Sequence, residues 1–304
     1  MKSTYNQSLP QIVSCLFGVS LFTSAWGEAP EHSVSNFESI EMLCELHQSN
    51  TQKSLIKKLP PETITYIKSK YEHTLFTKEH LFYPAKKAKK LIILFNGANK
   101  NRYMMFSWFW NDKEMWRDTA YLFLKDDDYC WYLGNNEKDF VQDYSNIINH
   151  YIKVCKLTPD QVFTVGSSMG AYASIFYATM LGLKGVIALN PQVNKMANEA
   201  TRYSIKNAGR RWQDLDKMLA LHTKVPNISL IFAYDPRDEA AGYALIDELK
   251  KKSPMLLIRR HPASMHGIAN LVFSKEFVES EINYLEKSTQ FMETKSLIFD
   301  DDDI

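Results

Sequence analysis

Cysteine and glycine are scarce in this chain of 304 residues, which contains four cysteines and 11 glycines. The cysteines are Cys15, Cys44, Cys130 and Cys155, and none of them form a C-x-x-C pair. Their spacing excludes a zinc knuckle and a thioredoxin-like redox site, and it does not fit a disulfide framework. If the N-terminus is removed, three cysteines are left and at least one is free or pairs between chains. This count favours a reducing compartment.

The sequence also lacks an excess of charge of either sign. Lys and Arg number 36 and Asp and Glu number 35, so the formal net charge is +1. Nothing in this balance indicates nucleic acid or an anionic membrane as a partner. The charged fraction of 23% and the hydrophobic fraction of 45% are typical of a globular protein. The length suffices for one large α/β domain or two small ones.

The N-terminal apolar run, residues 12–22, is too short to span a bilayer, which needs about 20 residues. It has the length of a signal peptide, follows Lys2 and precedes small residues at 23–25. A long polar stretch separates Lys2 from the run, so an N-terminal helix packed on the domain is the alternative. We therefore predict no membrane span and a cytoplasmic location, or a periplasmic or secreted one if residues 1–25 are cleaved. The sequence gives no indication of oligomeric state.

From Leu91 onward, short apolar runs alternate with helical patterns. The runs expected to be strands are 91–95, 121–124, 161–165, 185–189, 228–234 and 255–258. The expected helices are 138–156, 171–183, 241–251 and 276–286. This alternation predicts an α/β fold with a mostly parallel central sheet and helices on both faces. Residues 28–85 read as a few helices and a strand near 75–83.

The alternation stops between Asn190 and Pro226, where polar, helical sequence intervenes. We interpret this insertion, about 190–226, as a small helical cap. The predicted organisation is residues 1–27 as a signal peptide or N-terminal helix, followed by a single domain over 28–304 that carries the cap.

A G-x-S-x-G pattern, Gly166-Ser167-Ser168-Met169-Gly170, lies between the strand 161–165 and the helix 171–183. A tight strand-to-helix turn of this kind leaves no room for side chains at its two glycines, and it holds the serine hydroxyl clear of the backbone. Because glycine is scarce, a chance match is less frequent than usual. The pattern predicts Ser168 as a nucleophile, against the alternative of an ordinary turn with small packing residues.

A serine hydroxyl needs a base, and the base needs an orienting group. Two acids, Asp235 and Asp238, follow the strand 228–234, and His266 follows the strand 255–258. We favour His266 over His261, which lies close to the strand end and precedes a proline. We favour Asp238 as the orienting acid because it lies further into the loop, and Asp235 is the alternative.

An oxyanion hole would use the backbone N–H of Met169 and a second donor after the first buried strand. That loop begins Asn96-Gly97-Ala98, and the Ala98 N–H is our candidate donor. Asn96 and Gly97 are expected to line the substrate pocket. Three further residues are predicted to contact substrate: Trp131, Tyr132 and Gln192. Aromatic residues are dense near the expected mouth of the pocket, at 106–116 and at Trp131 and Tyr132. They could stack on a sugar ring or line an acyl channel, but most of them are expected to pack under the cap.

These motifs resemble those of the α/β-hydrolase superfamily over Leu91 to Leu285. The matching segments are L-I-I-L-F-N-G-A, V-G-S-S-M-G-A-Y-A-S, I-F-A-Y-D-P-R-D and S-M-H-G. The usual His-Gly after the first buried strand is Asn96-Gly97 here. The resemblance implies an eight-stranded sheet and a Ser-His-acid triad. More loosely, G-S-S-M-G-A-Y with L-N-P-Q and W-Y-L-G is similar to hydrolase-like proteins encoded with bacterial surface-polysaccharide genes.

The predicted function is hydrolysis of a carboxylic ester through an acyl-serine intermediate, with a small-molecule or glycan ester as substrate and no cofactor or metal. The alternatives are an acyltransferase acting on a glycan, and a non-catalytic accessory protein of polysaccharide biosynthesis. The sequence does not distinguish hydrolysis from acyl transfer.

Overall fold

The computed structural model describes residues 41–45, 59–98, 102–194, 207–233, 235–261 and 266–298, with backbone only for 41–45, 270 and 288–298. The predicted signal segment 1–27 lies outside these residues. Nine strands are described: β1 (Glu41–Glu45), β2 (Glu72–Leu75), β3 (Lys78–Tyr83), β4 (Lys90–Phe95), β5 (Thr119–Leu124), β6 (Val162–Ser167), β7 (Gly185–Leu189), β8 (Asn227–Ala233) and β9 (Leu256–His261).

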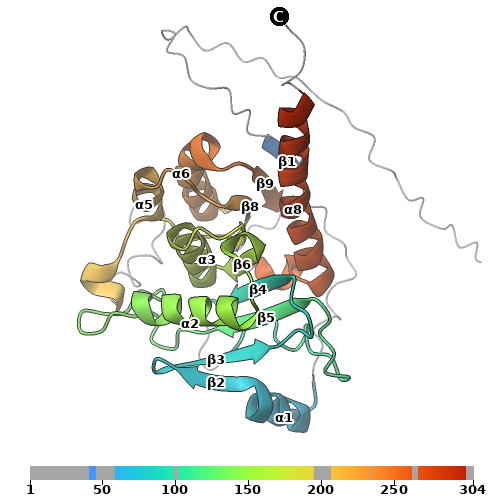
Figure 1. The fold of residues 1–304 in the computed structure, drawn as a ribbon. Coiled ribbons are helices and arrows are strands. Elements are labelled where there is room, and N and C mark those ends of the chain that lie inside the picture. The colour runs from blue at the N-terminus through green and yellow to red at the C-terminus, as the bar shows by residue number, and fades with distance from the viewer. Residues whose placement is uncertain are drawn as a thin grey trace, which may run out of the picture. The chain divides into compact units, whose positions relative to one another are not determined.

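These strands form one sheet in the order β1-β9-β8-β7-β6-β4-β5-β3-β2 (Figure 1). The run from β1 to β5 is parallel, whereas β3 pairs antiparallel with β5 and β2 pairs antiparallel with β3. Strands buried on both faces need continuous apolar runs, and β4, β6, β7 and β8 supply them. The carboxyl ends of parallel strands lie at the same edge of a sheet, so the segments that follow β6, β8 and β9 meet at that edge.

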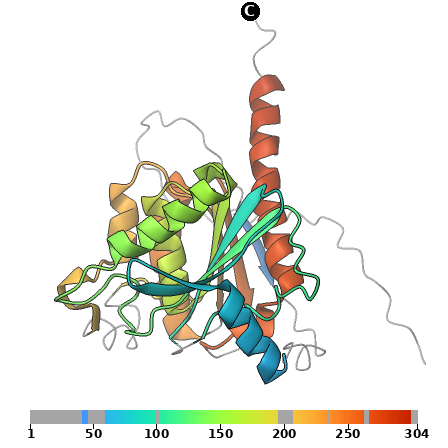
Figure 2. The same ribbon diagram turned by 60° about the horizontal axis from the view of Figure 1, so that its bottom comes forward.

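The helices are α1 (Pro61–Tyr71), α2 (Val141–Val154), α3 (Met169–Met180), α5 (Leu215–Leu221), α6 (Pro236–Lys252), α7 (Ala269–Val272) and α8 (Lys275–Ile298), with 3-10 turns η2 (Pro159–Gln161) and η3 (Gly209–Arg211). Alternate residues of β4 face opposite sides: Leu91 and Ile93 pack with α2, α3, α5 and α6, whereas Ile92 and Leu94 pack with α1, α7 and α8. Figure 2 shows α2 and α3 on one side of the sheet and α8 on the other.

The predicted α/β class, with a mostly parallel sheet covered on both faces, is confirmed. The described sheet has nine strands rather than eight, because β1 adds in parallel to β9 at one edge. The expected strand near 75–83 is a hairpin of β2 and β3, whose turn residues Phe76 and Thr77 both have positive φ. The predicted helix 241–251 begins earlier, at Pro236, so the loop expected around Asp238 is the first turn of α6.

The insertion predicted at about 190–226 is helical in its described part, where it forms η3 and α5. Trp212 anchors it by stacking on Tyr172 of α3, with ring centroids 5.0 Å apart, and by an edge contact to Trp131. The Tyr172 hydroxyl donates to the Gln213 carbonyl at 2.8 Å. The described insertion therefore packs against the side of the domain formed by α3 and α6.

Within the described ranges, no helix combines the length and the apolar character that crossing a membrane requires. The two cysteines whose side chains are described, Cys130 and Cys155, are free thiols.

Candidate active site

Ser168 occupies a strained turn between β6 and α3, with φ 56° and ψ −118°. A Cβ at Gly166 would lie 2.1 Å from the Gly170 carbonyl oxygen, and one at Gly170 would lie 2.2 Å from the Phe95 carbonyl oxygen. Both distances are far shorter than atoms tolerate, so this close approach of α3 to β4 and β6 requires glycine at both positions. Strained backbone of this kind is concentrated at functional sites. The turn is the geometry expected of a nucleophile elbow.

Three side chains from the carboxyl edge of the sheet meet in a hydrogen-bonded chain. His266 Nε2 lies 2.8 Å from Ser168 Oγ, and His266 Nδ1 lies 2.7 Å from Asp238 Oδ1. Asp238 is buried in the first turn of α6, whereas His266 is partly exposed. If Asp238 Oδ1 accepts from Nδ1–H, then Nε2 is left to accept the serine proton. The arrangement can activate a hydroxyl for nucleophilic attack.

Asp235, the alternative acid, has another partner. It is the N-cap of α6: its Oδ1 accepts from the Arg237 backbone N–H at 3.0 Å, and its carboxylate pairs with the Arg237 guanidinium, also at 3.0 Å. These hydrogen bonds lower the pKa of Asp235 to about 2. Asp235 thus stabilises the start of the helix that carries Asp238.

The segment around His266 is tied to the sheet by Asn190, which is fully buried at the end of β7. Its Nδ2 donates to the His266 carbonyl at 2.5 Å, and its Oδ1 accepts from the Ala233 backbone N–H at 3.0 Å. The Ser168 backbone N–H donates to the Leu189 carbonyl, one residue before Asn190, at 2.9 Å. The end of β7 therefore contacts both the serine turn and the histidine segment.

The candidate oxyanion donors come from the residue after Ser168 and from the loop after β4. Met169 is the first residue of α3, and the first N–H groups of a helix have no partner within the helix. Gly97 and Ala98 line the cavity beside Ser168 and His266. A Cβ at Gly97 would lie 3.3 Å from the Ser167 carbonyl oxygen, so the loop after β4 lies against the serine turn.

The cavity beside Ser168 has a volume of about 570 Å³. Asn96, predicted to line it, does so, although its side chain is buried. Sequence reasoning missed most of the wall, which comes from residues 102–108 after β4 and from Ala269 and Phe273 after His266. The dense aromatic residues at 106–110 were expected near the pocket mouth, whereas residues 102–105, Ala269 and Phe273 carry no such signal. Phe106 and Trp108 line the cavity, whereas Phe109 and Trp110 are buried. The expectation that most of this group packs under the cap is wrong, because Trp110 packs against Tyr71 of α1 whereas the described insertion packs against α3.

Three predicted substrate contacts are placed away from the cavity wall: Trp131, Tyr132 and Gln192 are all buried and none of them lines it. The Tyr132 hydroxyl donates to the carbonyls of Asn96 and Leu124, at 2.9 and 3.2 Å, so it braces the strand ends from inside the core. Trp131 packs edge-on against Trp212. Both side chains are therefore part of the buried core.

The described part of the insertion contributes no residue to the cavity wall. Among the residues that the structure describes, no group of three or more His, Cys, Asp or Glu side chains could hold a metal ion.

No protein-family model matches the sequence, and no curated protein matches it. Solved structures do match the fold. The capsule O-acetyltransferase of Neisseria meningitidis serogroup A aligns with a TM-score of 0.51 and 16% identity, over 71% of this chain and 93% of its own. An S-formylglutathione hydrolase from Agrobacterium tumefaciens aligns with a TM-score of 0.53 and 13% identity, over 72% and 94% of the two chains. A ferulic acid esterase aligns with a TM-score of 0.53 and 10% identity, over 71% and 97%. The chain therefore has the α/β-hydrolase fold.

Proposed function

We propose that this protein is a serine hydrolase that cleaves a carboxylic ester through an acyl-serine intermediate. The observation that carries the proposal is the hydrogen-bonded chain from Ser168 through His266 to Asp238, at 2.8 and 2.7 Å, beside a cavity of about 570 Å³. A decayed, non-catalytic relative would have no need to keep a strained serine, an aligned base and a buried acid together.

In the first half of the reaction, Ser168 Oγ attacks the ester carbonyl carbon while His266 Nε2 takes the hydroxyl proton. The tetrahedral intermediate collapses as the bond to the alcohol oxygen breaks, and His266 returns the proton to that oxygen. In the second half, His266 removes a proton from water while the water oxygen attacks the acyl carbon. As the bond between that carbon and Ser168 Oγ breaks, His266 returns the proton to Oγ, and the acid product leaves. Asp238 holds the imidazole in the tautomer that both halves need.

The negative charge on the carbonyl oxygen would be stabilised by the N–H groups of Met169 and Ala98. Donors that are already oriented toward a developing charge cost no reorganisation during the reaction, and one such donor is worth about 10²–10³ in turnover. The contact between Gly97 and the serine turn supports this placement of the loop after β4.

The second candidate function is transfer of the acyl group to a glycan hydroxyl in place of water. One finding favours it: the capsule O-acetyltransferase is among the structures of similar fold, although its identity to this chain is 16%. The partly exposed rings of Phe106 and Trp108 on the cavity wall could stack on a sugar.

Covalent labelling with a fluorophosphonate probe tests the nucleophile. Ser167 is the matched control, because it lines the same cavity and precedes Ser168 directly. We expect labelling of the wild type and of Ser167→Ala, and none of Ser168→Ala. Labelling of Ser168→Ala at the wild-type level would reject Ser168 as the nucleophile. Adding a glycan acceptor to an ester assay then separates transfer from hydrolysis by the acylated product.

A further inference from the structure

A second cavity, of about 540 Å³, lies at the amino edge of the sheet. Lys184 immediately precedes β7 and Asn227 is the first residue of β8, and both line this cavity. Ser168 follows the end of β6, at the opposite edge of the same parallel strands. The two cavities share no lining residue, so the second one is separate from the candidate active site.

The wall of this cavity is strongly basic. Its lining includes five lysines: Lys184, Lys224, Lys250, Lys251 and Lys252. Asp160 is the one carboxylate among the described lining residues. In a chain with a formal net charge of +1, this is a local concentration of positive charge. Grouped charges of one sign attract an oppositely charged ligand.

Helix α6 explains part of this charge without a ligand. Cations at a helix C-terminus are stabilised by the helix dipole, and residues 250–252 form the last turn of α6. Lys251 pairs with Glu248 at 3.1 Å, and Lys252 donates to the carbonyls of Leu219 and Ala220.

The same explanation does not cover Lys184 and Lys224. Neither belongs to a helix, and neither has an acidic partner within the part of the chain that the structure describes. Lys184 is partly buried and Lys224 is exposed, and both line the cavity.

Behind the lysines, the cavity is apolar and contains one unsatisfied hydroxyl. Its apolar lining residues are Ala178, Leu183, Val225, Pro226 and Pro254. Thr179 also lines it, is 5% exposed, and has a buried Oγ1 with no hydrogen-bond partner among the described residues. A buried hydroxyl without a partner costs free energy that a bound polar group would recover.

The walls are held in place by hydrogen bonds to the backbone. Ser253 Oγ contacts the carbonyls of Pro226 and Met255 at 2.8 and 2.7 Å, and Asn227 Nδ2 donates to the Leu285 carbonyl at 3.0 Å. A cavity whose walls are fixed before binding loses less conformational entropy when a ligand enters. Its volume also falls within the range of small-molecule sites, about 300–1,000 Å³.

We propose that this cavity binds an organic anion with an apolar body, such as a medium-chain carboxylate. The carboxylate would pair with Lys184 and Lys224 and accept a hydrogen bond from Thr179. The alkyl chain would cover the apolar wall. A small inorganic anion would pair with the lysines but leave the apolar wall exposed to water. A neutral alcohol would cover that wall but bring no negative charge to pair with the ammonium groups.

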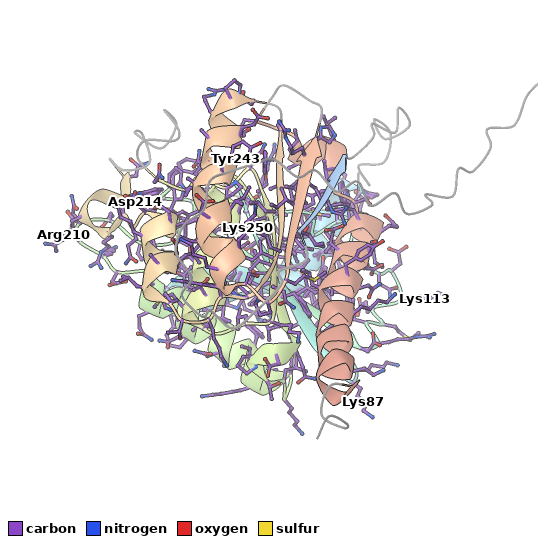
Figure 3. All side chains as sticks on the ribbon, turned by 90° about the horizontal axis from the view of Figure 1, so that it is seen from above. Lys87, Lys113, Arg210, Asp214, Tyr243 and Lys250 are labelled. Carbon is purple, nitrogen blue, oxygen red and sulfur yellow. The ribbon has the colours of Figure 1, made fainter. Side chains whose placement is uncertain are left out.

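Calorimetric titration of the full-length protein with decanoate tests this assignment. The test variant is Lys184→Ser/Lys224→Ser. The matched control is Lys87→Ser/Lys113→Ser, which removes the same charge from two exposed lysines that lie apart from Lys250 in Figure 3. Thr179→Val removes the hydroxyl while conserving shape, and thermal unfolding of each variant checks its fold.

We expect Kd for decanoate to rise about tenfold or more in Lys184→Ser/Lys224→Ser, about threefold or more in Thr179→Val, and to stay within about twofold in the control. Decanol and inorganic phosphate should each bind the wild type at least about tenfold more weakly than decanoate. Equal decanoate affinity in the wild type and Lys184→Ser/Lys224→Ser would overturn the proposal, as would phosphate binding as tightly as decanoate. Neither readout depends on ester turnover, so this test is independent of the proposed hydrolase activity.

Discussion

Asn190 Nδ2 donates a hydrogen bond to the backbone carbonyl of His266 at 2.5 Å. The bond joins the end of β7 to a segment 76 residues further along the chain, and it fixes the backbone of the residue that contacts Ser168. Asn190 is fully buried and touches neither the Ser168 hydroxyl nor the wall of the cavity. Its expected role is to position His266.

Asn190→Asp should lower kcat about 10- to 100-fold with little change in KM, because a carboxylate cannot donate to the His266 carbonyl and small displacements of a base are costly. The control is Asn227→Asp, which removes a similar buried amide-to-carbonyl bond, to Leu285, at the other end of β8. Both variants should lose stability, but only Asn190→Asp should slow fluorophosphonate labelling of the folded protein. Equal labelling rates in the two variants would show that Asn190 has a structural role alone.

Asp238→Asn should reduce ester turnover by about 10²–10⁴-fold, since an amide stabilises the wrong imidazole tautomer. Asp235→Asn should lower turnover far less and act mainly on unfolding, because the amide oxygen can still cap α6 but the charge that pairs with Arg237 is lost. Steady-state kinetics of the two variants at matched fractions folded make the comparison. A larger loss in Asp235→Asn would reverse the roles assigned to the two acids.

Gly170→Ala should destabilise the fold by about 1–3 kcal/mol or more, because its Cβ would meet the Phe95 carbonyl oxygen at 2.2 Å and push α3 away from β4. Gly182→Ala is the comparison: Gly182 has φ +62° but open space around it, so strain alone should cost about 1 kcal/mol. Chemical denaturation measures both changes. A Gly170→Ala protein as stable as Gly182→Ala would contradict the packing described at the serine turn.

The protein should lose stability below neutral pH through His80. Burial lowers the pKa of His80 from 6.5 to about 4, so the unfolded chain binds the proton first. The stabilisation from keeping His80 neutral is fully present above pH 6.5 and is lost as the pH falls toward 4. The loss of unfolding free energy reaches about 2 kcal/mol at pH 5. Unfolding free energies at pH 7 and pH 5 should show this loss in the wild type and in His73→Gln, and about 2 kcal/mol less of it in His80→Gln. The same loss in all three proteins would rule out His80 as its source.

The sequence was sufficient to predict the parallel sheet and to nominate the residues that the structure brings together. Continuous apolar runs and the G-x-S-x-G turn are local signals that can be recognised in the sequence. Because the carboxyl ends of parallel strands lie at one edge of the sheet, the residues that follow them are expected to lie close together. The reason for choosing Asp238 was incomplete, because that residue begins a helix rather than extending a loop. The helix start was missed although Asp235-Pro236 is a typical N-cap followed by proline.

The contacts that sequence reasoning missed join segments far apart in the chain. The Asn190–His266 bond and the packing of Trp212 on Tyr172 depend on tertiary structure, and no local pattern indicates them. Trp131 and Tyr132 are predicted to contact substrate because aromatic rings beside a pocket can stack on a sugar or line an acyl channel, although most aromatic residues are expected to pack under the cap. The structure buries them instead, because the Tyr132 hydroxyl finds backbone acceptors inside the core.

The most direct test of the proposed activity is ester turnover by Ser168→Ala beside Ser167→Ala, with the fold of each variant verified by thermal unfolding. A chromogenic acetate ester is a suitable substrate. If Ser168 is the nucleophile, Ser168→Ala should lower turnover by about 10³-fold or more while Ser167→Ala stays within about tenfold of the wild type. A loss of less than about tenfold in folded Ser168→Ala would contradict the account.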